Sequence, residues 1–201
     1  VYTVALRVHD GTEYSKIIKH QIEIFDYKID LTDKEWNLVS LPLVPEDDDT
    51  EIEHVFTDVL GNVTKIWSYQ MGEWKVYSQA PNDLKEIKPG YGYYIKMKEA
   101  STSYQNGKKM YGNEEEEWTV PKPPVVTVTP SWNLIGHYGM RDDVLRDEAL
   151  TTLSENYATV LDENGKPVLE GDSFTPKEGY WLFLTGIDTL YYAPSEKAYN
   201  Y

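Results

Sequence analysis

Two sequence patterns occur twice in this chain, and they keep the same order each time. The segment 36–40 (WNLVS) returns 96 residues later as 132–136 (WNLIG). The segment 89–97 (PGYGYYIKM) returns 87 residues later, more loosely, as 176–184 (PKEGYWLFL). A duplicated module repeats the positions that pack its core, so the 201 residues are expected to form two small related modules rather than one large domain.

The segments around these landmarks read mainly as strands. Residues 66–69 (IWSY) and 74–77 (WKVY) flank a turn, which is typical of a hairpin. The same hairpin in module two is expected over 159–161 and 168–169. The 17 Tyr and 6 Trp against only 4 Phe suit half-buried strand surfaces, where a ring packs and its polar tip stays wet.

One short helix is expected in each module. In module one, apolar residues at helical spacing begin at Ile52, and Thr50 with Glu53 has the form of a capping box. In module two, Asp142 or Asp143 would cap the helix that follows.

The first residues carry a recognisable strand motif. Residues 2–11 (YTVALRVHDG) resemble the closing hairpin of PKD-type immunoglobulin-like domains, which commonly carry a Y-T-V-T-L-x-V-x-D run. A second alternating run, 18–24, would supply the partner strand. The resemblance implies that the segment is the tail of such a domain within a larger modular extracellular protein.

The duplicated plan itself is similar to tandem modules of secreted and cell-surface proteins of archaea and bacteria. Its signature is W-N-L-[VI]-S-x-P, a short helix, an I-W-x-Y hairpin and P-G-x-G-Y-[YW]-[IL], covering residues 31–193. Such modules occur in S-layer-like proteins and as appendages of extracellular hydrolases. Module two departs from the signature, because 136–138 (GHY) replaces 40–42 (SLP) and the aromatic hairpin is lost.

These patterns together predict a mainly β fold. We expect the tail of an immunoglobulin-like β-sandwich in residues 1–30, followed by two homologous small β-rich domains, each with one short α-helix. Module one would span 31–120 and module two 121–201, joined by the stiff stretch 121–124 (PKPP).

Charge and composition exclude several classes of partner. A formal net charge of −15 disfavours nucleic acid and anionic membranes, because their phosphates would be repelled. The sequence holds no apolar stretch long enough to span a bilayer. Cysteine is absent, so disulfides, thiol catalysis and thiolate metal sites are excluded.

No catalytic arrangement emerges from the sequence, so we expect no enzyme. The four histidines are scattered, without metal-ligand spacing. The segment 171–174 (GDSF) resembles the G-D-S block of an esterase family, but no histidine follows His137 to complete that site. Most acidic residues fall in loop-like runs rather than in a cleft that could raise a carboxyl pKa.

Calcium is the one cofactor that the acidic loops suggest, since hard cations need clustered oxygen ligands. The alternative is a solvated acidic loop or a simple turn. The candidate ligands are Asp47, Asp48, Asp49, Asp162 and Asn164.

Aromatic side chains are the candidate ligand-binding residues, because apolar sugar faces stack on exposed rings of a strand face. The alternative is that these rings form a second core layer or cover one module with its neighbour. Strand alternation places Tyr94 and Trp181 at equivalent positions. The candidates are Trp67, Tyr69, Trp74, Tyr77, Tyr94 and Trp181.

The expected function is therefore a non-catalytic, extracellular or cell-surface segment with a structural, adhesive role in a larger secreted or surface protein. Its partners would be neighbouring domains of the same polypeptide. The alternative is a carbohydrate-binding appendage of a secreted polysaccharide-degrading enzyme, with a polysaccharide or cell-surface glycan as partner. Exposure of the aromatic residues separates the two hypotheses.

Overall fold

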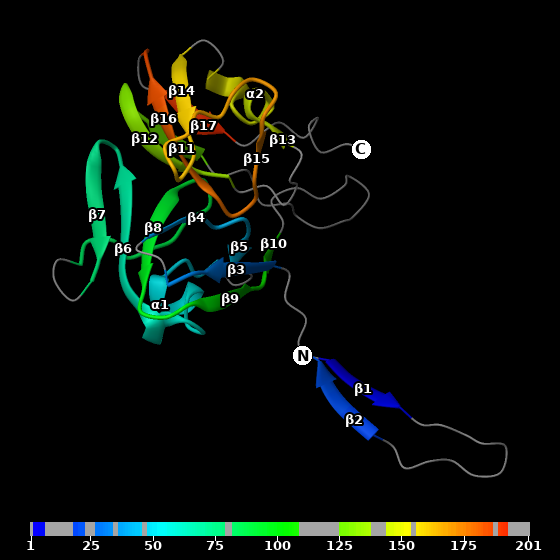
Figure 1. The fold of residues 1–201 in the computed structure, drawn as a ribbon. Coiled ribbons are helices and arrows are strands. Elements are labelled where there is room, and N and C mark those ends of the chain that lie inside the picture. Colours follow the sequence, from blue (N-terminus) through cyan, green and yellow to red (C-terminus); the bar gives the residue numbers. More distant parts are fainter. Residues whose placement is uncertain are drawn as a thin grey trace.

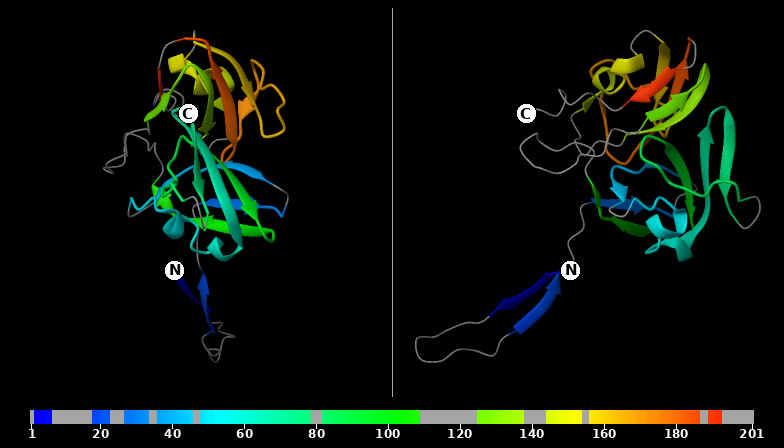
Figure 2. Two further views of the ribbon diagram at one scale, coloured as in Figure 1. Left: turned by 90° about the vertical axis from the view of Figure 1, so that its left-hand side faces the viewer. Right: turned by 180° about the vertical axis from the view of Figure 1, so that it is seen from behind.

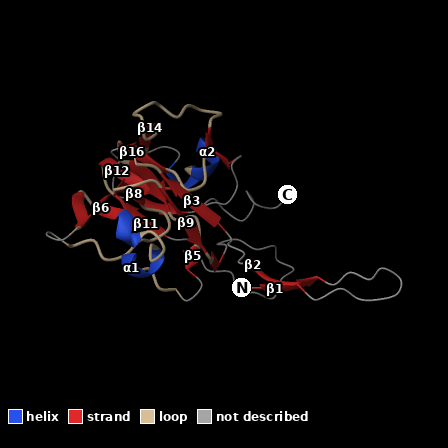
Figure 3. Cartoon of the chain, turned by 60° about the horizontal axis from the view of Figure 1, so that its bottom comes forward, coloured by secondary structure: helices blue, strands red, loops and turns tan. Residues whose placement is uncertain are grey.

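The computed structural model of the chain has a mainly β fold with small antiparallel sheets and two short helices, as predicted (Figures 1 and 3). The structure describes residues 2–6, 18–22, 27–33, 36–45, 48–78, 82–108, 125–137, 144–153, 156–186 and 189–192. Within these ranges, no helix has the length and apolar character that a bilayer crossing requires.

The first two strands form the expected hairpin. Strand β1 (Tyr2–Leu6) pairs antiparallel with β2 (Ile18–Ile22), with Tyr2 opposite Ile22. Figures 1 and 2 show this hairpin projecting from the body that the other strands build. Its membership of an immunoglobulin-like sandwich stays a prediction, and the intervening turn lies outside the described residues.

Module one is built around a four-stranded antiparallel sheet in the order β4-β8-β6-β7. Two further strand pairs, β3 with β9 and β5 with β10, close its other side. Its elements are β3 (Tyr27–Leu31), β4 (Asn37–Ser40), β5 (Val44–Pro45), α1 (Ile52–Val55), the 3₁₀ helix η1 (Leu60–Asn62), β6 (Val63–Gln70), β7 (Glu73–Tyr77), β8 (Gly92–Met97), β9 (Ser101–Gln105) and β10 (Gly107–Lys108).

Module two repeats this plan with a three-stranded sheet in the order β12-β16-β14. The pairs β11 with β17 and β13 with β15 complete it. Its elements are β11 (Val125–Val128), β12 (Ser131–Gly136), β13 (Val144–Leu145), α2 (Arg146–Ala149), the 3₁₀ helix η2 (Thr151–Leu153), β14 (Tyr157–Leu161), β15 (Ser173–Phe174), β16 (Gly179–Leu184) and β17 (Thr189–Tyr192).

The first strand of each module was not predicted, and it moves one boundary. Strand β3 pairs along its whole length with β9 near the other end of module one. Its Ile29 and Leu31 are buried in the core of module one, so that module begins at Tyr27 rather than at Leu31. Strand β11 pairs in the same way with β17 in module two.

Each module has its own apolar core on one face of its sheet. The core of module one gathers the inward residues of β4, β6 and β8 with α1, among them Ile66, Ile95 and Phe56. The core of module two contains Val160, Leu182 and their neighbours from β12 and α2. The equivalent strands therefore bury equivalent positions, so the repeat in the sequence reflects a repeat of core positions.

The capping box expected at α1 is wrong. The helix begins at Ile52 with Glu51 at its N-cap, and no side chain caps it. The Thr50 hydroxyl instead donates to the Glu86 carboxylate. Other groups accept hydrogen bonds from the free N–H groups at this end of the helix. The Glu51 N–H donates to the Asp49 carboxylate, and the Ile52 N–H donates to the Lys85 carbonyl.

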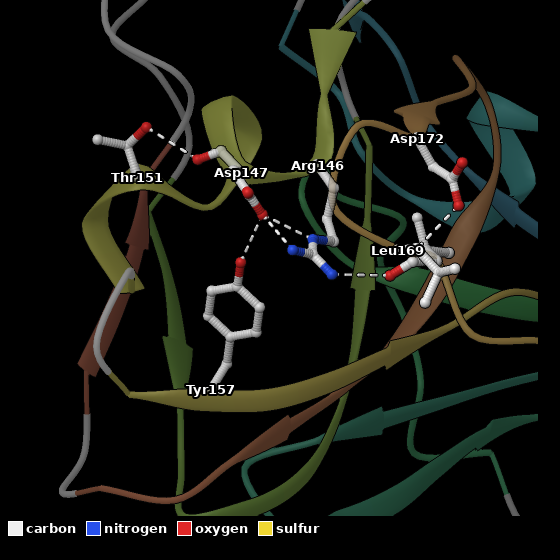
Figure 4. A network of polar contacts seen from close by, with 7 residues as sticks. Arg146, Asp147, Thr151, Tyr157, Leu169 and Asp172 are labelled. Atoms are coloured by element: carbon white, nitrogen blue, oxygen red, sulfur yellow. Dashed lines mark hydrogen bonds and ion pairs between the residues drawn. The ribbon is translucent and has the colours of Figure 1, made fainter.

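Helix α2 likewise has no side-chain cap, since Leu145 precedes it, and the expected caps Asp142 and Asp143 lie outside the described residues. A polar network holds it to the strands (Figure 4). The Arg146 guanidinium contacts the Asp147 carboxylate and donates to the Val168 carbonyl, and the Tyr157 hydroxyl donates to Asp147. The Tyr157 hydrogen bond and Arg146 lower the pKa of Asp147.

Candidate functional site

The asparagine of the repeated W-N-L pattern makes the same hydrogen bonds in both modules. The Asn37 side chain accepts from the Thr32 N–H and donates to the Thr32 carbonyl. The Asn133 side chain makes the same pair of hydrogen bonds with Thr129. Both amides are buried, so the Asn of each W-N-L pattern pins the chain that enters the central strand.

The tyrosine of each G-Y pattern also has one repeated role. The Tyr93 hydroxyl accepts a hydrogen bond from the Lys88 N–H at 2.8 Å, and the Tyr180 hydroxyl accepts one from the Thr175 N–H at 2.8 Å. Burial raises the pKa of Tyr180 to about 12. These repeated residues therefore maintain the fold rather than provide chemistry.

The two modules meet at a corner built from glycines, which we call the junction. A Cβ on Gly92 would lie 2.8 Å from the Leu134 side chain, and a Cβ on Gly179 would lie 2.7 Å from the Leu38 side chain. Gly136 is tighter still, because a Cβ there would overlap the Tyr91 carbonyl oxygen. Only glycine permits this approach of one module to the other.

Backbone hydrogen bonds cross the junction in equivalent pairs: each bond from module one to module two has a counterpart from module two to module one. The Ser40 N–H donates to the Lys177 carbonyl, and the Gly136 N–H donates to the Gly90 carbonyl. Ser40 and Gly136 are equivalent in the duplication, as are Gly90 and Lys177. The bridges Val39–Glu178 and Tyr91–Ile135 are related in the same way, so the junction has approximate two-fold symmetry.

The sheet face opposite the cores carries a continuous aromatic surface across the junction, which we call the aromatic face. Five of the six tryptophans belong to it, and neighbouring ring centroids lie 5.1–6.5 Å apart. Its members are Trp36, Trp67, Tyr69, Trp74 and Tyr94 of module one, and Trp132, Trp181 and Phe183 of module two.

One hydrogen bond joins the two halves of the aromatic face. The Trp181 Nε1–H donates to the Tyr94 hydroxyl at 2.8 Å. Burial raises the pKa of Tyr94, and the bond from Trp181 offsets part of that rise, so the phenol is neutral at physiological pH. It therefore keeps a proton to donate while it accepts from the indole.

The β6–β7 hairpin of module one reaches β12 of module two (Figure 1). A shallow hollow of about 420 Å³ opens there in the aromatic face. Trp74 and Trp132 form its most exposed walls, with 43% and 36% of their surface accessible. It is lined by Tyr69, Trp74, Trp132, Leu161 and Trp181.

The rings around the hollow are steeply inclined to one another. The planes of Trp74 and Trp181 meet at 74°, and those of Trp132 and Trp181 at 89°. Tyr69 meets Trp74 at 63°. Edge-to-face contacts of this kind are favourable for aromatic pairs and hold the rings in fixed orientations.

Five of the six predicted aromatic candidates lie together on this face, and Tyr77 does not. Strand alternation turns Tyr77 to the opposite side of β7 from Trp74, where it packs against the core of module one. Sequence reasoning missed Trp36, Trp132, Phe183 and Leu161. The register gave a signal for Trp36, because β4 pairs Leu38 with Tyr94, and Trp36 lies two residues before Leu38 on the same face.

The predicted acidic ligands do not come together. Asp162 uses its Oδ1 to accept from the backbone N–H groups of Asn164 and Lys166, which is a turn. Asp49 accepts from the Glu51 N–H, and Asp48 occupies a left-handed conformation with φ of 63°. Asp47 lies outside the described residues, and within those described no three acidic or histidine side chains form a metal-binding group.

Comparisons of the chain with family models, with curated proteins and with solved structures found no match. The resemblances to PKD-type domains and to tandem surface modules therefore stay predictions.

Proposed function

We propose that this chain is a non-catalytic structural and interaction segment of a larger secreted or cell-surface protein. Its two modules act as one semi-rigid unit, and the aromatic face is the surface through which that unit contacts other molecules. Neighbouring domains of the same polypeptide are its first partners, and the projecting β1–β2 hairpin is the side that leads toward them.

The observation that carries the proposal is the glycine junction. Contacts of Gly92 with Leu134, of Gly179 with Leu38 and of Gly136 with Tyr91 leave no room for the modules to turn on each other. Paired backbone hydrogen bonds reinforce them. An extended protein on a cell surface needs such fixed joints, since a flexible joint would not transmit position or force.

The polar clusters of the described residues support a role without catalysis. Asp147, Arg146 and Tyr157 form an exposed network that holds α2 to β14 rather than a cleft. The strongly raised tyrosine pKa values belong to Tyr27, Tyr93 and Tyr180, for which burial is the first cause, and all three side chains serve the packing of their modules.

The test of the proposal is whether the modules behave as one body and whether the parent protein is outside the cell. Residual dipolar couplings from residues 27–108 and 125–192 should fit one alignment tensor. An antibody raised against the chain should label intact cells that express the parent protein. Two independent tensors, or labelling only after the cells are opened, would overturn the proposal.

A further inference from the structure

We propose that the hollow in the aromatic face binds a single neutral saccharide chain, held between Trp74 of module one and Trp132 of module two. The inference rests on the proposed function and names the partner of its interaction surface. Three features of the face carry it: rings that no core requires, a ring geometry that suits a free chain, and a charge that selects neutral ligands.

The first feature is that neither core requires these rings. The core of module one closes with Ile66, Ile95 and residues of α1, and the core of module two with Val160 and Leu182, all on the other side of the sheets. An exposed tryptophan such as Trp74 gains little for folding, because much of its surface remains in water. Two exposed tryptophans with half-buried aromatic rings between them form an apolar patch, which is typical of a binding surface.

The rings are also ordered before any ligand arrives. Trp74 contacts Trp67, Tyr69 and Trp181 edge to face, and the hydrogen bond that Trp181 donates to the Tyr94 hydroxyl holds the Trp181 ring in place. A saccharide then stacks without the entropy loss that ordering of flexible side chains would add. The hollow, at about 420 Å³, falls within the range of small-ligand sites.

The ring geometry selects the form of the saccharide. A crystalline polysaccharide surface needs coplanar rings in a row, whereas the planes around this hollow meet at 50° to 89°. Inclined walls can instead hold the two faces and the edge of one sugar chain.

Charge selects a neutral ligand. The chain carries a net charge of −15, and Glu163 lies close enough to Tyr94, the hydrogen-bond partner of Trp181, to raise the pKa of Tyr94 further. A uronic acid or sulfated sugar would be repelled by this field, whereas hydroxyl-bearing neutral sugars would not. The apolar C–H faces of neutral pyranoses match the indole walls.

The experiment measures binding of cellohexaose, chitohexaose, xylohexaose and maltohexaose by calorimetry and by tryptophan fluorescence of the whole chain. We expect at least one of the four to bind and to change the emission, because three tryptophans line the hollow. Trp74→Ala and Trp132→Ala should each weaken that binding about tenfold or more, as truncation of a central aromatic anchor does. Oligogalacturonate and crystalline cellulose should not bind.

Tyr104→Ala is the matched control, because Tyr104 is an exposed aromatic of β9 on another side of module one. It should leave saccharide affinity unchanged. The inference is overturned if none of the four oligosaccharides binds, or if binding survives both tryptophan substitutions. It is equally overturned if the chain self-associates in sedimentation and Trp74→Ala abolishes that association, since the face is then a protein interface. Each of these results leaves the test of the rigid unit untouched.

Discussion

The Trp181 Nε1–H donates to the Tyr94 hydroxyl at 2.8 Å, so equivalent residues of the two modules contact each other across the junction. Tyr94→Phe removes only the hydroxyl and keeps the ring. It should lower the free energy of unfolding by about 1 kcal/mol, because the indole N–H loses its partner in a partly buried place.

Urea unfolding followed by circular dichroism measures this change, and Tyr104→Phe is its control at an exposed site. Equal stabilities of Tyr94→Phe and the original chain would mean that the hydrogen bond contributes nothing to the junction.

Substitution of the junction glycine should be far more damaging than that of a glycine in open space. Gly136→Ala introduces a methyl group into the Tyr91 carbonyl and places it 2.5 Å from the Ser40 Cβ, so we expect a loss of about 3 kcal/mol. Gly61→Ala meets no atom within 4 Å and should leave stability unchanged or raise it by up to about 1 kcal/mol. Scanning calorimetry of the two variants compares them directly.

The two W-N-L asparagines should be equally important for stability. Asn37→Ala and Asn133→Ala each remove a buried amide and leave an N–H and a carbonyl of the entering chain without their side-chain partner, which costs about 2 kcal/mol. Asn164→Ala, on an exposed turn, should change stability by less than about 0.5 kcal/mol. Chemical unfolding of all three variants tests the statement that the repeated motif serves the fold, which a selective effect of Asn37→Ala alone would contradict.

Alkaline pH should destabilise the protein through its buried tyrosines. Burial raises the pKa of Tyr180, and that of Tyr27, from 10.0 to about 12, and raises the pKa of Tyr93 as well. The unfolded chain releases these protons first, so stability is fully present below pH 10 and declines between pH 10 and about pH 12. For Tyr180 the loss approaches about 2 kcal/mol, and it is smaller for Tyr27, which is only partly buried.

Unfolding measured at a series of pH values above neutrality reports this loss. Tyr180→Phe should start less stable, because the Thr175 N–H loses its acceptor, and should then show a shallower alkaline decline. If the stability of Tyr180→Phe falls with pH as steeply as that of the original chain, deprotonation of Tyr180 is not a cause of the alkaline destabilisation.

Local patterns were enough to predict the central strands and the β6–β7 hairpin. The segments around Leu38 and Ile95 each occur twice in the sequence, and period-two alternation sets which side of the sheet each residue faces. Strands β3 and β11 were missed because they are short and pair with strands near the other end of their modules, which no local window contains. The capping box failed for a related reason: Lys85, which meets the Ile52 N–H, lies more than thirty positions along the chain.

The candidate site was predictable residue by residue but not as an assembly. Alternation alone could have removed Tyr77, since it lies three positions from Trp74 and so on the opposite side of the strand. The contact of Tyr94 with Trp181 depends on how the two modules dock. The alternation of side chains along a strand does not predict the orientation of one module against the other. The glycines at 92, 136 and 179 are traces of that docking in the sequence, but a glycine alone does not indicate which segment it approaches.

The approximate two-fold symmetry of the junction has a consequence for assembly. A contact related by a two-fold axis uses the same patch on both members, so once the modules have met, neither retains that patch for a third. The tandem is thus closed in the manner of a dimer, although both members belong to one polypeptide. An array built from such modules would therefore have to grow through other surfaces, and this pair would enter it as a single finished unit.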